Sequence, residues 1–161
     1  IFNTNICTEF NLEYDSIKKY ANLNDISLTN ISINEVSELI TNIRSISLPN
    51  PEQIPNVGSF FKNAITKKTN IKEEDYSLDE LVLWEINSKV VKVGSARLIE
   101  LIKNQLDKYD NVKLSESHAL VLVTNEHASQ DEVISFAKHI QDKVFKNFNI
   151  KLEIEPTVIL N

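Results

Sequence analysis

The sequence contains no methionine, one cysteine and only two glycines among its 161 residues. Because methionine is absent, Ile1 is not a natural translation start, and we expect the chain to be a fragment of a longer protein. A single cysteine, Cys7, excludes an intrachain disulfide and favours a reducing compartment, so the expected location is the cytoplasm. Two glycines cannot form a glycine-rich phosphate-binding loop, so any dinucleotide would be held mainly by missing sequence.

Other absences exclude whole classes of protein. No apolar run reaches about 18 residues and residues 1–10 do not resemble a signal peptide, so we expect no membrane span. A net charge of −6 argues against nucleic-acid binding. His127 and His139 have no metal-type spacing to Cys7 or to acidic residues, and no metal site is predicted. A hydrophobic content of 42% suits one globular domain with a core, and a monomer is favoured.

Apolar residues at helical spacing predict three helices. The first, over residues 32–44, begins at a capping box in which Ser32 precedes Glu35 by three positions. A second capping box of the same type begins another helix at Ser129. Residues 95–107 carry their apolar side chains on one helical face and form the third helix.

Alternating or β-branched apolar runs predict short strands between these helices. The runs lie at residues 1–14, 90–93, 119–124 and 149–160. Pro156 interrupts the last run, which marks it as an edge strand. The polar residues 15–31 are interpreted as a connector, and the charged residues 66–79 as a solvated loop. This alternation predicts an α+β (split α/β) fold, a small mixed sheet with two to three helices packed on it.

The octet of residues 56–63, Asn-Val-Gly-Ser-Phe-Phe-Lys-Asn, stands out in so glycine-poor a chain. A glycine retained at position 58 indicates a backbone with positive φ or the close approach of another group. Ser59 would then be presented from a tight turn, above an aromatic floor of Phe60 and Phe61. From the residues alone, Ser59 can equally be a turn hydroxyl that satisfies a backbone group.

The octet resembles the N-A-G-S-F-F-K-N segment of the UDP-N-acetylenolpyruvoylglucosamine reductases, the MurB family. Four further blocks resemble that family in the same order: Arg44 with Leu48-Pro49, residues 92–100, residues 118–123 and residues 148–155. Together they extend over roughly residues 32–160. The resemblance implies that residues 1–14 are the last strand of an FAD-binding domain, 15–31 a connector and 32–161 the substrate-binding C-terminal domain.

The resemblance also implies a reaction. In this family NADPH reduces FAD, and the reduced flavin passes hydride to C3 of UDP-N-acetylglucosamine enolpyruvate, after which C2 is protonated. Ser59 occupies the position of the proton donor, and Glu155 that of a glutamate that stabilises the enolic intermediate. A carboxyl group beside an enolate must be protonated or well compensated, since like charges repel in a low-dielectric cleft. Without the resemblance, Glu155 is a solvent-facing residue of an edge strand.

Binding roles follow from the same resemblance. Tyr14 matches a tyrosine that contacts the substrate diphosphate, Asn63 a residue that contacts the nucleotide, and His118 a position near the substrate. Arg44 and Gly58 are assigned to the cofactor side of the site. The alternative for His118 is a hydrogen-bonded histidine at the start of a strand.

Departures from the family pattern leave a second function open. Ser47 replaces a substrate-binding lysine, and Arg97 replaces the tryptophan at a helix start. The alternative is therefore a catalytically degenerate MurB-like domain that binds a nucleotide-sugar or acts as a structural or interaction module. Trp84, like the Phe60-Phe61 pair, is interpreted as a core residue and not as a base-stacking platform, because the acidic chain provides no electrostatic funnel.

Overall fold

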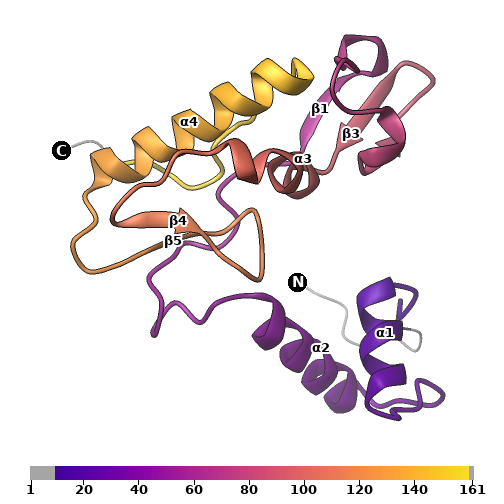
Figure 1. Ribbon diagram of the computed structural model, residues 1–161. Helices are drawn as coiled ribbons and strands as arrows, with labels where there is room; N and C mark the ends of the chain where they lie inside the picture. Colours follow the sequence, from indigo (N-terminus) through magenta and orange to yellow (C-terminus); the bar gives the residue numbers. More distant parts are fainter. Residues whose placement is uncertain (1–9, 160–161) are drawn as a thin grey trace. The chain divides into compact units, whose positions relative to one another are not determined.

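The computed structural model describes residues 10–159 and contains two compact units, Ile1–Ser47 and Leu48–Asn161 (Figure 1). Residues 33–47 belong to the first of these units, since the helix that they form contacts a helix earlier in the chain. The assignments of residues 1–14 to a flavin domain and 32–161 to a substrate-binding domain stay predictions. Residues 1–9 of the strand predicted over 1–14 lie outside the described residues, and residues 10–14 form no strand.

The first unit is built from helices α1 (Asp15–Leu23) and α2 (Ile33–Ser47). Helix α1 lies within residues 15–31, the segment interpreted as a connector, and the role of this segment as a connector stays a prediction. Ile17 and Ala21, four positions apart, share one face of α1 and are buried. This pair is too short an apolar pattern to stand out among the Asn and Asp residues around it.

The capping box predicted for α2 is confirmed. The Ser32 N–H donates to Glu35 Oε2 at 2.7 Å, and the Glu35 N–H donates to Ser32 Oγ at 3.3 Å. The Ser32 hydroxyl also donates to the carboxylate, and this bond, followed by the backbone one, holds the pKa of Glu35 below its ordinary value. The cap therefore stabilises the helix above the unfolded pKa of Glu35 and weakens as the pH falls through the folded value.

The second unit contains two antiparallel sheets rather than one mixed sheet. Strands β1 (Ala64–Lys67), β3 (Val90–Val93) and β2 (Leu83–Glu85) form a three-stranded sheet in that spatial order. Strands β4 (Val112–Leu114) and β5 (Leu122–Thr124) form a hairpin. The predicted α+β class is confirmed, as is the strand at 90–93, whereas β1, β2 and β4 were not predicted.

Two helices pack with these sheets around one core. Helix α3 (Ser95–Ile102) contacts α4 (Gln130–Phe148), which in turn contacts β4. Figure 1 shows α4 running alongside the β4–β5 hairpin. Short 3₁₀ turns, η1 (Lys68–Asn70), η2 (Leu78–Glu80) and η3 (Lys103–Gln105), connect the elements. The largest fully buried side chains are Phe61, Phe148, Leu98, Ile99, Ile102, Ile140 and Ile150.

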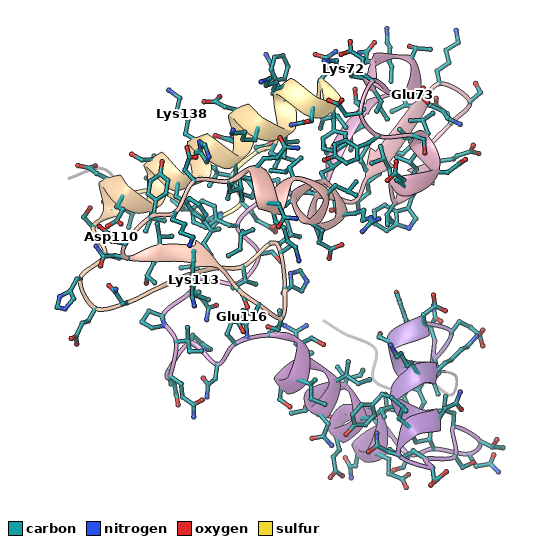
Figure 2. All side chains as sticks on the ribbon, viewed as in Figure 1. Lys72, Glu73, Asp110, Lys113, Glu116 and Lys138 are labelled. Atoms are coloured by element: carbon teal, nitrogen blue, oxygen red, sulfur yellow. The ribbon has the colours of Figure 1, made fainter. Side chains whose placement is uncertain are left out.

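Several predicted elements are shorter than their sequence patterns. The helix predicted over 95–107 ends at Ile102 and continues only as η3, and the strand predicted over 119–124 is regular only as β5. Residues 149–159 form no strand beyond a single bridge. The charged segment 66–79 includes the end of β1, and Lys72 Nζ donates to the Lys146 carbonyl of α4 at 3.5 Å. Glu73, labelled in Figure 2, is exposed.

The second capping box is only half formed. Ser129 Oγ accepts from the Glu132 N–H at 3.2 Å, as predicted. The Glu132 carboxylate instead accepts two hydrogen bonds of 3.0 Å from Asn111, one from its N–H and one from its side-chain amide. Glu132 therefore joins the start of α4 to the residue before β4, a tertiary contact that competes with the local cap.

Candidate functional site

Gly58 forms a turn that only a positive φ allows. Its φ is +76°, and a Cβ built at this position would have no neighbouring atom within 4 Å. The glycine is therefore needed for its backbone conformation and not for close approach. Asn56 shapes the turn, because its Oδ1 accepts from the Gly58 N–H at 2.9 Å while its amide donates to the Ile54 and Pro49 carbonyls.

We expect Gly58→Ala to destabilise the protein by about 1–2 kcal/mol, since a Cβ is strained at this φ. Gly58→Asn is the matched control, because asparagine visits this region more readily and should cost less. Urea unfolding followed by circular dichroism gives both values. An alanine variant as stable as the wild type would show that the turn tolerates a side chain.

Ser59 follows directly and lies in an extended segment held on one side by the turn before β5. Ser59 pairs with Val121 in an antiparallel bridge, and the Phe60 N–H donates to the Leu120 carbonyl at 2.7 Å. The same turn is closed by the Val121 N–H, which donates to the carbonyl of His118 at 3.0 Å. The segment of Ser59 and the turn of His118 are thus direct neighbours.

The other side of this segment is held by the chain near Glu155. Phe61 pairs with Ile154 in an antiparallel bridge, and the Glu155 N–H donates to the Phe60 carbonyl at 3.0 Å. Ser59 and Glu155, far apart in sequence, therefore lie on adjacent extended segments. Phe60 and Phe61 are 5% and 1% exposed, which confirms that this pair belongs to the core.

Lys62 provides a positive charge beside Glu155. Its ammonium pairs with Glu153, and this hydrogen bond raises the pKa of Lys62, with a smaller Coulombic contribution from Glu155. Lys62 thus remains charged as long as the pH stays below its raised pKa. Glu155 is itself exposed, so its carboxylate has both solvent and a nearby cation to compensate it.

Asn63 has a structural contact at the start of α3. Its Oδ1 accepts from the Ser95 N–H at 3.0 Å, and the buried Ser95 hydroxyl donates to the Lys62 carbonyl at 2.7 Å. The Asn63 side chain therefore caps the start of α3, although Asn63 lies far from that helix in sequence. Its amide nitrogen has no hydrogen bond recorded among the described residues, and an Asn side chain offers two donors there.

Asn63→Ala is expected to lower the free energy of unfolding by about 0.5–2 kcal/mol, the usual cost of losing a helix cap. Asn63→Asp keeps the accepting oxygen but replaces the amide donor by a carboxylate. It should retain most of the stability, because the cap needs only the accepting oxygen. Thermal unfolding of the two variants measures this difference, and an equal loss in both would show that the cap does not depend on Oδ1.

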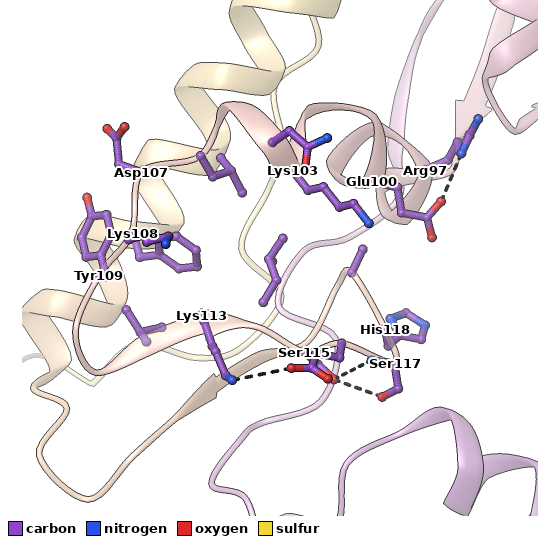
Figure 3. A pocket seen from close by; sticks show the side chains of 17 residues that line it. Arg97, Glu100, Lys103, Asp107, Lys108, Tyr109, Lys113, Ser115, Ser117 and His118 are labelled. Atoms are coloured by element: carbon purple, nitrogen blue, oxygen red, sulfur yellow. Dashed lines mark hydrogen bonds and ion pairs between the residues drawn. The ribbon is translucent and has the colours of Figure 1, made fainter.

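A hollow of about 1010 Å³ lies beside this region (Figure 3). Its walls come from α3 and η3, the loop at 106–109, β4 and the loop that leads to His118. The charged lining residues are Arg97, Lys103, Lys108, Lys113, Glu100, Asp107 and Glu116. Four cations against three carboxylates make this wall slightly positive within a chain of net charge −6.

His118 has a defined tautomer when neutral. Its Nδ1 accepts from the Leu120 N–H at 3.2 Å, so the neutral ring carries its proton on Nε2. Nε2–H is then a donor on a residue that lines the hollow. His118 is thus hydrogen-bonded at the entry to β5, as its structural interpretation proposed, and one donor still remains.

Comparison with known proteins identifies the family. Residues 50–159 match the family described as UDP-N-acetylenolpyruvoylglucosamine reductase, C-terminal domain. The chain belongs to this family. Reductases of that name from Flavobacterium johnsoniae and from Buchnera aphidicola subsp. Baizongia pistaciae are 33% and 34% identical to it, each over 85% of this chain. One from Xanthomonas campestris is 30% identical over 98% of the chain.

The chain spans 42%, 41% and 45% of the lengths of these three reductases, so it corresponds to less than half of each. The match confirms the resemblance seen in the sequence blocks. Within the reductase C-terminal domain, the structure brings together the segments of Gly58, Ser59, Asn63, His118 and Glu155.

Two of the predicted binding residues lie in the other unit. Tyr14 precedes α1 and is 63% exposed, and Arg44 lies in the last turn of α2. Ser47, where the resemblance implies a lysine in the family, donates its hydroxyl to the Ile43 carbonyl at 2.9 Å. The hydroxyl is therefore bound within its own helix.

Arg97, the second departure from the reductase pattern, is held by its own contacts. Its Nε donates to the Glu80 carbonyl at 2.9 Å, and its Nη1 lies 3.4 Å from the Glu100 carboxylate. The guanidinium thus joins α3 to η2 at the edge of the hollow. Lys103 also lines the hollow and is exposed, and it takes part in no ion pair among the described residues.

The interpretation of Trp84 as a core residue was wrong, because its side chain is 48% exposed. The run Leu81-Val82-Leu83-Trp84 is continuously apolar, so no alternation marked which side chains face outward.

Some classes of site are absent from the described part of the chain. Between residues 10 and 159 no helix is long and apolar enough to cross a membrane. The same residues contain no group of three or more His, Cys, Asp or Glu side chains placed to hold a metal ion.

Proposed function

We propose that this chain is the C-terminal, substrate-binding part of a reductase that converts UDP-N-acetylglucosamine enolpyruvate to UDP-N-acetylmuramate with NADPH, in the cytoplasm, for peptidoglycan precursor synthesis. The observation that carries this proposal is the Gly58 turn, which places Ser59 between the segments of His118 and Glu155. The family match supports it over residues 50–159.

The described residues do not themselves fit a flavin. The chain has two glycines, of which Gly58 makes a single turn and Gly94 approaches Val82 and Trp84, so no glycine-rich cradle for a diphosphate is present. We therefore assign FAD to the part of the longer protein that this chain does not include. There it would supply the hydride for C3 of the enolpyruvyl group.

The chain's own residues act on the substrate. Once C3 has accepted a hydride, C2 is a carbanion or enolate, a far stronger base than an alkoxide, so the Ser59 hydroxyl can transfer its proton to C2. The resulting serine alkoxide recovers a proton from water. Glu155 stabilises the enolic intermediate from the adjacent segment, as the family resemblance implies.

Binding would use the donors around this centre. Nε2–H of neutral His118 and the amide of Asn63 are suited to oxygens of the substrate. We propose that Tyr14 contacts the diphosphate and that Arg44 and Gly58 lie on the cofactor side, as the family resemblance implies.

The test compares the longer protein with residues 1–161. The longer protein is expected to purify with bound FAD and to oxidise NADPH only when the enolpyruvyl substrate is present. Residues 1–161 should elute from gel filtration without flavin. A flavin-free longer protein with no substrate-dependent NADPH oxidation would contradict the proposal and favour a degenerate domain that binds a nucleotide-sugar or acts as an interaction module.

A further inference from the structure

Trp84, the single tryptophan of the chain, lies on an open face of the three-stranded sheet. It stands in a row across the sheet with Lys92 on β3 and Ile65 on β1, because Lys92 is the register partner of both. The Lys92 ammonium lies over the indole, 5.7 Å from the ring centroid. Trp84 and Ile65 are 48% and 67% exposed, so this row combines a cation with uncovered apolar surface.

The edge of the indole lies beside Gly94, the residue before α3. A Cβ at Gly94 would lie 3.4 Å from Trp84 Cη2 and 3.1 Å from Val82 Cβ, so the absence of a side chain there leaves room for the ring edge. The Gly94 N–H also donates to the Val82 carbonyl at 2.8 Å. Gly94 directly precedes Ser95, whose N–H is bound by Asn63. The exposed ring and Asn63 thus contact consecutive residues, Gly94 and Ser95, at the start of α3.

The chemistry of this pair suits a ligand with both an aromatic ring and an anionic group. An exposed indole offers a π surface on which a planar base can stack. An ammonium fixed beside that ring attracts phosphate and is not neutralised by a carboxylate, since no ion pair is recorded for Lys92 among the described residues. A nucleoside diphosphate carries both features in one molecule.

We propose that Trp84 and Lys92 form a platform for the nucleotide end of the substrate, with the indole stacked on the uracil ring and the ammonium directed to the diphosphate. This inference rests on the proposed function, since a uridine nucleotide is the substrate class that the function requires. It adds two residues that the sequence analysis did not assign to binding.

The test uses UDP and the chain of residues 1–161, in which all tryptophan emission comes from Trp84. UDP is expected to quench this emission in a saturable titration, with excitation at the long-wavelength edge of the indole band, where UDP does not absorb. Inorganic pyrophosphate, which has no base, should quench far less at equal concentration.

Variants separate the ring from the charge. By calorimetry, Trp84→Leu should weaken UDP binding about tenfold or more, the usual size of a lost base–aromatic stack, whereas Trp84→Phe keeps a ring and should stay within about threefold of wild type. Lys92→Met should weaken UDP more than uridine. Lys138→Met is the matched control, because Lys138 is exposed on α4 (Figure 2). This variant should bind UDP as the wild type does.

Two results would overturn the platform. One is UDP affinity unchanged in Trp84→Leu, and the other is no quenching and no heat of binding at millimolar UDP. Activity of the longer protein keeps the two proposals apart. Turnover with an unchanged KM in Trp84→Leu would reject the platform and leave the reductase function intact. A wild-type protein without turnover would reject the function, while UDP binding by residues 1–161 would still decide the platform.

Discussion

Ser59→Ala, made in the longer protein, is expected to slow reduction of the enolpyruvyl substrate by about 10²–10⁴-fold, a barrier increase of roughly 3–5 kcal/mol. In the proposed mechanism C2 then loses its proton donor, while the Gly58 turn and the bridge to Val121, which are backbone features, remain. Reduction of the flavin by NADPH should be nearly unchanged, because that half-reaction requires no proton at C2.

Stopped-flow absorbance of the flavin measures the two half-reactions separately. Loss of a proton donor lowers kcat and kcat/KM together, whereas loss of a binding contact chiefly raises KM. Ser115→Ala is the control. It removes a hydroxyl in the loop before His118, outside the Gly58 turn. Reoxidation within about threefold of wild type in Ser59→Ala would reduce Ser59 to a turn residue.

Phe148→Ala is expected to lower the free energy of unfolding by about 3–5 kcal/mol. Phe148 is fully buried at the end of α4, and its ring packs on Tyr76 with centroids 5.0 Å apart. Truncation leaves a cavity between α4 and the segment before η2, which the surrounding chain can fill only in part. With a typical domain stability of about 5–15 kcal/mol, this is a large share of the total.

Phe145→Ala is the matched control for this prediction. Phe145 lies one turn earlier on the same helix but is 44% exposed, so its truncation should cost under about 1 kcal/mol. Urea unfolding of both variants gives the comparison. Similar losses at the two positions would mean that the burial of Phe148 does not determine the cost of its truncation, because alanine itself favours a helix more than phenylalanine does.

Local signals in the sequence were read correctly where nothing distant competes with them. The capping box of Ser32 and Glu35 needs only its own turn of chain, and it is present. Ser129 likewise accepts the hydrogen bond from the Glu132 N–H that its cap predicts. The Glu132 carboxylate, however, accepts from the N–H and the side-chain amide of Asn111 and not from the Ser129 N–H, because the tertiary fold brings Asn111 next to it. No local pattern could show that choice.

The arrangement of the candidate site was predictable only through the family resemblance. The glycine at 58 indicated a special turn, and its positive φ is confirmed. Pairing of the Ser59 segment with two distant stretches follows from tertiary hydrogen bonds, which leave no periodic trace in the sequence. Exposure of Trp84 was missed for a related reason, since a continuously apolar run does not show which of its side chains a sheet leaves uncovered.

The double pairing of the Ser59 segment also has a consequence during synthesis on the ribosome. The partners of Phe60 and Phe61, Leu120 on one side and Ile154 and Glu155 on the other, are translated long after them. Contacts between residues so distant in sequence form late and slowly. While the nascent chain is shorter than this, the Gly58 turn lacks these pairing partners, so the Ser59 segment can complete its pairing only after residue 155 has been synthesised.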